Sequence, residues 1–140
     1  MNGKVSNTSR DDRAKLSHPI ADRSRLTARE VLDEHVKLFN FGVRTRDFGP
    51  MISQFSKDAE MYFEGIPVGP FKGRPAISEA YSSRPPDDEI IILSVKWAPG
   101  KNEINGEYAW SRNAKVRAGE LRIETKRDQI MKLTVRYESH

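Results

Sequence analysis

The sequence has 140 residues, a net charge of +4 and no cysteine. This length fits one domain with its own hydrophobic core, and the lack of cysteine excludes disulfides, thiolate catalysis and cysteine-based zinc sites. Three scattered histidines argue against a metal site, and no apolar run approaches the roughly 20 residues of a membrane span or forms the apolar block of a secretory signal. We therefore expect a cytoplasmic protein that uses no metal or cofactor.

Residues 1–25 are polar and carry most of the excess positive charge. They contain six Lys or Arg and three Asp, a net of +3, whereas the remaining chain has 18 basic and 17 acidic residues, a net of +1. We expect a flexible basic N-terminal arm here, followed by a single domain over residues 26–140. The chain shows no basic stripe with interleaved aromatic residues, so we expect no nucleic-acid partner.

Three helices are predicted in the N-terminal half. Thr27 is a candidate N-cap, and Glu30 completes a capping box with it; apolar residues at helical spacing then continue to about Arg46. Pro50 suits the first turn of a short second helix, over residues 51–55. Pro75 suits the first turn of a third helix, over residues 75–81.

Strands are predicted after the second helix and after the third. Residues 59–64 have two faces, one with Met61 and Phe63 and the other with Tyr62 and Glu64. A glycine- and proline-rich loop follows, and four more strands are predicted over residues 90–97, 107–113, 121–125 and 130–138. Helices followed by hairpin-linked strands form an α+β pattern. Several strands are apolar on both sides, which favours a homodimer that forms through the sheet face.

This order of elements resembles the nuclear transport factor 2-like superfamily, which includes SnoaL-like polyketide cyclases and ketosteroid isomerases. The matching segments are residues 55–59 (FSKDA), 73–77 (GRPAI) and 128–135 (DQIMKLTV), and the resemblance covers about residues 26–138. It implies a cone-shaped domain in which three helices and a curved, mostly antiparallel sheet enclose a pocket. It also implies a small hydrophobic ligand, such as a steroid-like or polyketide-like carbonyl compound. The architecture hosts enzymes and binding modules alike, so it is less specific for activity.

The resemblance also suggests where catalytic residues would lie. The isomerases combine a carboxylate base with an oxyanion hole made of a tyrosine and a protonated acid. Counting back from the GRPAI segment places the base at Glu64. The tyrosine position falls on Phe39, which has no hydroxyl, and His35 lies one turn earlier on the same helix face.

The position of the oxyanion acid depends on strand register. Counting back from the last hairpin places this acid at Glu120. Leu121 and Ile123 alternate as the apolar face of the same strand. If they point into the cavity, Glu120 points away from it and Gly119 takes the inward position.

Two functions therefore remain open. The first is a cofactor-free, isomerase- or cyclase-like enzyme in which Glu64, buried and raised in pKa, abstracts a proton next to a carbonyl group. The second is a non-catalytic small-ligand-binding or dimerisation domain, in which Glu64 is a surface or rim carboxylate paired with Lys72 or Arg74, and His35 is a core histidine. The predicted pocket residues are Phe39, Phe55, Tyr62, Tyr81 and Trp110.

Overall fold

A computed structural model describes residues 26–138 of the chain. Residues 1–25, for which we predicted a basic arm, lie outside the described residues. Within residues 26–138, three α-helices and a six-stranded sheet form the fold. In chain order the elements are α1 (Ala28–Thr45), α2 (Gly49–Ile52), β2 (Phe55–Glu64), β3 (Phe71–Lys72), α3 (Arg74–Ser83), β4 (Ile90–Lys96), β5 (Glu103–Trp110), β6 (Arg117–Lys126) and β7 (Gln129–Tyr137). The predicted α+β class is confirmed.

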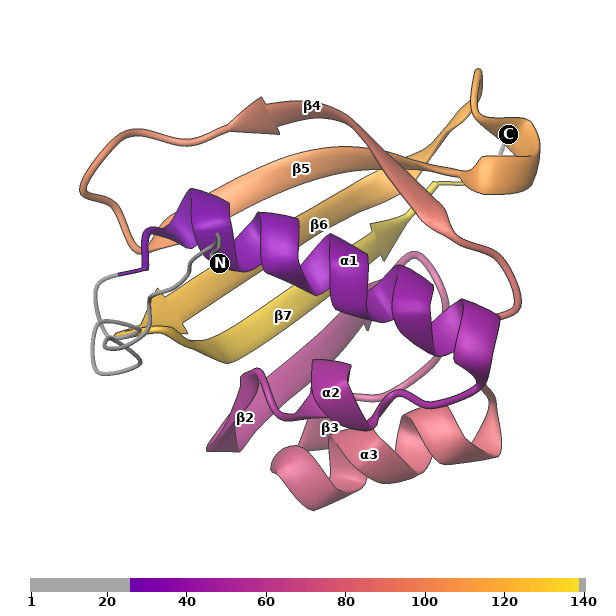
Figure 1. Cartoon of the computed structure of the whole chain (residues 1–140), viewed down its shortest axis with the longest axis horizontal. Helices are drawn as coiled ribbons and strands as arrows, with labels where there is room; N and C mark the ends of the chain where they lie inside the picture. Colours follow the sequence, from indigo (N-terminus) through magenta and orange to yellow (C-terminus); the bar gives the residue numbers. More distant parts are fainter. Residues whose placement is uncertain (1–25, 139–140) are drawn as a thin grey trace, which may run out of the picture.

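The sheet is mixed but mostly antiparallel. Its strand order is β3-β2-β7-β6-β5-β4. The β2–β7 pair is parallel, and the other neighbouring pairs are antiparallel. Helix α1 lies across one face of the sheet, whereas α2 and α3 lie beside its β2–β3 side (Figure 1). The helices therefore cover one face only, which we call the inner face.

Helix α1 begins and ends as its sequence predicts. The backbone N–H of Glu30 donates to Thr27 Oγ1 at 3.1 Å, and the backbone N–H of Thr27 donates to Glu30 Oε1 at 2.9 Å. These two bonds form the predicted capping box, which satisfies otherwise unpaired donors at the helix start. Arg46 ends the helix in the left-handed conformation. One stripe of the helix packs into the core, and it contains Ala28, Val31, Leu32, His35, Phe39 and Gly42.

Several strands begin earlier than predicted. Strand β2 begins at Phe55 rather than at residue 59, β5 spans Glu103–Trp110 rather than 107–113, and β6 begins at Arg117 rather than at residue 121. The early part of β2 contains Lys57 and Asp58, whose side chains are exposed. Sheet pairing joins backbone groups, so polar strand ends can pair without the apolar alternation from which the boundaries were predicted.

The two faces of the sheet differ in chemistry. The inner face is apolar, and its buried residues include Met61, Ile104, Leu121, Ile123 and Leu133. Side chains alternate along each strand, so the intervening residues lie on the opposite, outer face, among them Glu60, Tyr62, Glu64, Glu120, Arg122, Lys132 and Arg136. The structure describes one chain, so the expected homodimer through this outer face stays a prediction. No helix among residues 26–138 is both long enough and apolar enough to span a bilayer.

Candidate functional site

A cavity of about 710 Å³ lies between the helices and the inner face of the sheet. Its deep walls are mostly buried apolar side chains, namely Phe39, Met61, Ile90, Leu121 and Leu133. Toward the solvent it is bordered by the loop after β2 and the end of α3, with Ile66, Pro67, Val68, Ser83, Arg84 and Pro86. The cavity is therefore closed by apolar residues at its base and partly open at its mouth.

His35 is a buried polar residue in the wall of this cavity. It projects from the buried stripe of α1, and its side chain is only 2% exposed. Its Nδ1 lies 2.9 Å from Oε1 of Gln54. Burial disfavours the charged imidazolium and lowers the pKa of His35 to about 4, although the hydrogen bond to Gln54 acts in the opposite direction. His35 is therefore neutral at neutral pH.

Tyr81 and Tyr108 bring two hydroxyl groups to the same cavity. Burial raises the pKa of both phenols, that of Tyr108 to about 12, so both are protonated at neutral pH. The Trp110 ring packs edge-on against Tyr108, with 5.6 Å between ring centroids. Among residues 26–138, no side chain or backbone group forms a hydrogen bond with His35 Nε2 or with either hydroxyl. These groups are available to a bound molecule.

Four of the predicted site residues line the cavity: His35, Phe39, Tyr81 and Trp110. Phe55 is fully buried and packs edge-on against the His35 ring at 6.1 Å, but it does not line the cavity. Tyr62 lies on the outer face, where its hydroxyl donates to Glu60 Oε1 at 2.7 Å. Phe55 therefore supports the cavity from behind, and Tyr62 is separated from it by the sheet.

Glu64 does not reach the cavity. Its side chain is exposed on the outer face, where its strand position pairs with that of Arg136. Phe63, the residue before it, lines the cavity, and consecutive residues of a strand point to opposite faces. The burial expected of a catalytic base in the cavity does not occur at Glu64. It is a surface carboxylate, but within the described residues it forms no ion pair with Lys72 or Arg74.

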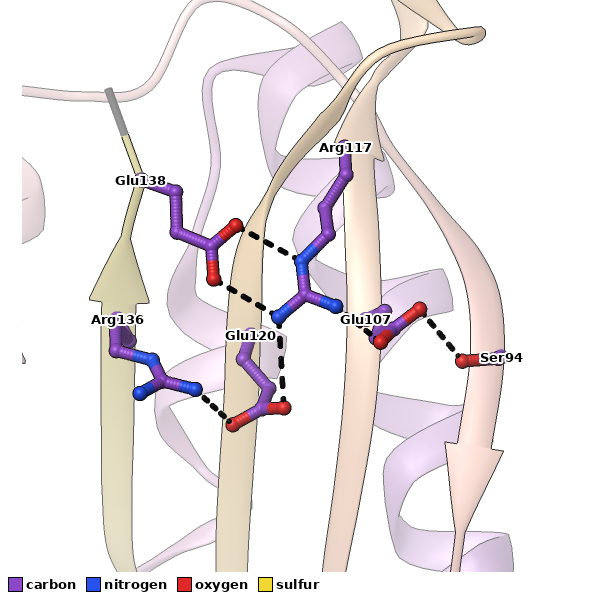
Figure 2. Close-up of polar contacts among 6 residues, drawn as sticks. All are labelled: Ser94, Glu107, Arg117, Glu120, Arg136 and Glu138. Carbon is purple, nitrogen blue, oxygen red and sulfur yellow. Dashed lines mark hydrogen bonds and ion pairs between the residues drawn. The ribbon is translucent and has the colours of Figure 1, made fainter. Parts of the chain in front are cut away.

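Glu120 also lies on the outer face, in an ion-pair network (Figure 2). Its carboxylate accepts a hydrogen bond from Arg136 Nη2 at 3.0 Å and lies 3.7 Å from Arg117 Nη2. Arg117 also binds both carboxylate oxygens of Glu138, at 2.9 Å each, and donates to Glu107. Glu107 in turn accepts a bond from the Ser94 hydroxyl at 2.9 Å. The acid expected to complete an oxyanion hole thus takes part in a surface network instead.

The strand register explains this placement of Glu120. Leu121 lines the cavity, so its neighbour Glu120 points away from it. Gly119, the alternative position, has no room for a side chain. A Cβ atom built there would lie 1.9 Å from the carbonyl oxygen of Arg136 and 3.1 Å from the ring of Tyr108. Neither position brings an acid into the cavity.

The sequence analysis missed Tyr108, although the strand pattern contained a signal for it. Tyr108 lies two residues before Trp110 on β5, so a strand that directs Trp110 into the cavity also directs Tyr108 there. The prediction of residues 107–113 placed Tyr108 near the strand start, where its direction could not be judged. Within residues 26–138, no three His, Asp or Glu side chains are grouped so that they could hold a metal ion.

Comparison of the chain with known proteins gives matches in structure only. No family model and no curated protein matches the sequence. An NTF2-like protein of unknown function from Cytophaga hutchinsonii has a TM-score of 0.62 and 15% identity, over 81% of this chain and 91% of that one. A computationally designed 17-OHP binder has a TM-score of 0.60 and 16% identity, over 77% and 91% of the two chains.

A third similar structure contains a ligand. RV0760c from Mycobacterium tuberculosis, in complex with estradiol-17beta-hemisuccinate, has a TM-score of 0.60 and 13% identity, over 77% of this chain and 91% of that one. Similarity at these identities concerns the fold and not the activity. Together with the element order and the sheet topology, it shows that this chain has the nuclear transport factor 2-like fold.

Proposed function

We propose that this protein binds a neutral, largely apolar small molecule of about steroid size in the cavity between the helices and the inner face. The observation that carries this proposal is the cavity itself, about 710 Å³ in volume, with apolar walls and a few polar groups that lack partners among residues 26–138. Ligand sites in proteins are typically about 300–1,000 Å³, mostly apolar, with a small number of polar groups that orient the ligand.

The charges at the cavity favour a neutral ligand. Glu79 and Arg84 are charged residues of its lining, and both are exposed. His35, inside, is neutral because burial lowers its pKa. An ionised ligand group in this interior would lose its hydration without gaining a counter-charge. Two proteins of similar fold are a 17-OHP binder and a complex with estradiol-17beta-hemisuccinate, which supports a ligand of about steroid size.

Ligand binding has more support than carboxylate catalysis. An isomerase- or cyclase-like reaction of the expected kind needs a carboxylate within hydrogen-bond reach of the bound substrate. Glu64 and Glu120 lie on the outer face, and Glu79 is exposed on α3. Catalysis through Glu64 would require the end of β2 to turn so that this side chain points into the cavity. The placement of these acids therefore favours the alternative of a small-ligand-binding domain.

The fluorescence of Trp110 gives a direct test of binding. The protein has two tryptophans, and Trp97 lies outside the cavity with its indole N–H bonded to the carbonyl oxygen of Lys101 at 3.1 Å. A Trp97→Phe variant therefore reports from the cavity alone. If each of about 24 heavy atoms contributes about 0.3 kcal/mol of binding free energy, the Kd of the ligand is on the order of 10 µM. We expect the fluorescence of Trp110 to change in a saturable way with estradiol or 17-OHP, and not to change with sucrose.

A variant that fills the cavity tests where the ligand binds. Ala80 lines the cavity from α3, and Phe at this position should reduce affinity about tenfold or more, because the added ring occupies the ligand volume. Ser82→Phe is the matched control, because Ser82 is exposed on the same helix and does not line the cavity. Circular dichroism checks that both variants fold. Equal affinity in the two variants, or no saturable binding at all, would overturn the proposed function.

A further inference from the structure

We infer that the ligand of this cavity bears a neutral hydrogen-bond donor, a hydroxyl or an N–H group, that donates to Nε2 of His35. This inference rests on the proposed function and specifies the ligand chemistry of the same site. It follows from the hydrogen bonds behind the cavity wall, which fix the position of the proton on the His35 ring.

The first step is the orientation of the Gln54 side-chain amide. Its Nε2 lies 3.4 Å from the carbonyl oxygen of Val31 and 3.3 Å from Oε1 of Glu34. A carbonyl oxygen and a carboxylate oxygen can only accept, so the –NH₂ end of the amide must face them. Gln54 is 6% exposed, and the reversed amide would place its oxygen against two acceptors. The oxygen end of Gln54 therefore faces His35.

The second step is the tautomer of His35. Nδ1 lies 2.9 Å from this Gln54 oxygen, which is an acceptor, so Nδ1 carries the hydrogen and donates it. A neutral imidazole has one ring hydrogen, and Nε2 is left with a lone pair. His35 is neutral because burial lowers its pKa. Nε2 can therefore accept a hydrogen bond and cannot donate one.

The third step places Nε2 at the cavity. His35 lines the cavity and Gln54 does not, so the Nδ1 side of the ring faces away from it and the Nε2 side faces toward it. Among residues 26–138, Thr134 Oγ1 is the one fully enclosed side-chain nitrogen or oxygen without a partner. Nε2 of His35 also has no protein partner, so it is not fully enclosed and can be reached from the cavity.

The neighbouring groups make His35 the selective contact. The hydroxyls of Tyr81 and Tyr108 also lie at the cavity, but a hydroxyl can donate or accept, so they tolerate either a carbonyl or a hydroxyl on the ligand. Nε2 accepts only, and a ketone or ether oxygen in front of it would place two acceptors together. An oxyanion hole presents donors to a substrate oxygen, so His35 offers the opposite polarity to the one expected from the resemblance.

Matched ligands test the inference. Estrone has one hydroxyl, on its aromatic ring, and 3-deoxyestrone lacks only that group. Trp97→Phe protein should bind estrone about tenfold more tightly, because the deoxy compound leaves Nε2 without a donor. Replacing His35 by Phe in the same background should reduce this ratio to about one. Equal binding of both compounds by the parent protein overturns the inference and leaves the proposed function standing; binding of neither overturns both. A ratio that persists in the His35→Phe variant also overturns the inference.

A second measurement needs neither ligand nor a change at the site. The protein has three histidines, and a His18→Gln, His140→Gln double variant keeps His35 as the only one. Long-range ¹H–¹⁵N correlation spectra distinguish the two neutral tautomers by the ring protons coupled to each nitrogen. We expect the Nδ1–H form for His35 at pH 7. Observation of the Nε2–H form, or of a protonated ring, would overturn the inference.

Discussion

The two sides of the sheet differ in whether their polar side chains have hydrogen-bond or ion-pair partners. On the outer face these groups bind one another: Arg117 contacts Glu107, Glu120 and Glu138, and Tyr62 donates to Glu60. At the cavity on the inner side polar side chains are few. The hydroxyl of Tyr108 on the inner face, Nε2 of His35 on α1 and the hydroxyl of Tyr81 on α3 have no partner in the described part of the chain. The same strands β5, β6 and β7 supply both faces.

This difference indicates where a ligand would bind. A buried polar group without a partner costs about 1–3 kcal/mol, so such groups are rare unless water or a ligand satisfies them. The charged outer-face groups named above are exposed or half-buried and are satisfied by their neighbours. Thr134, whose strand position pairs with those of Tyr62 and Arg122, is the exception: it is buried, and its hydroxyl has no partner among residues 26–138. The contrast therefore agrees with the proposed ligand site in the inner cavity. The catalytic carboxylates suggested by the sequence, Glu64 and Glu120, both lie on the outer face.

The largest effect should come from adding a methyl group at Gly119. A Cβ atom there would lie 1.9 Å from a backbone carbonyl oxygen, so we expect Gly119→Ala to lower the free energy of unfolding by about 3 kcal/mol. Gly106→Ala is the matched control on the inner face, because its Cβ would meet Leu32 at an ordinary 3.4 Å. Urea unfolding measures both variants. Similar losses in the two would contradict the close packing of β6 against β7.

A smaller effect on stability should come from lowering the pH, because His35 is buried in its neutral form. The pKa of His35 is about 4 when folded and about 6.5 when unfolded, so between these values the unfolded chain binds the additional proton. Stability should therefore fall as the pH falls through this window, by roughly 2–3 kcal/mol at pH 4.5 from His35 alone. This contribution levels off above about pH 7.5, where His35 is neutral in both states.

The variant His35→Phe isolates that contribution. Its unfolding free energy should change less between pH 7 and pH 4.5 than that of the native protein, although it is less stable at pH 7 because Gln54 loses its donor. Urea unfolding at the two pH values gives the comparison. The same pH dependence in both proteins would show that His35 is not the buried neutral residue described above.

The smallest effect should come from replacing Glu64 on the outer face. Glu64→Gln removes a charge from an exposed side chain that does not line the cavity, so ligand affinity in the Trp110 fluorescence assay should change less than twofold. Tyr81→Phe is the contrasting inner-face change, because it removes a hydroxyl from the cavity. A large loss of affinity in the Glu64 variant would mean that this residue contacts the ligand after all.

The sequence was sufficient for features that depend on neighbouring residues. The capping box of Thr27 and Glu30, the helical stripe with His35 and Phe39, and the element order of the fold were all readable from local spacing. The alternation of Leu121 and Ile123 also led to the alternative in which Glu120 points away from the cavity, as it does in the structure. Strand starts were less accurate, because exposed polar residues such as Lys57 at the start of β2 leave no apolar pattern.

The tertiary structure alone decided which polar groups come together. Counting along the chain located Glu64 at the end of the correct strand, but a shift of one residue reverses the face to which a strand side chain points. Gln54 and His35 are 19 residues apart, and nothing in their spacing predicts the bond that fixes the histidine tautomer. Local periodicity thus determined the elements, whereas the register of the sheet and contacts between distant segments determined the site.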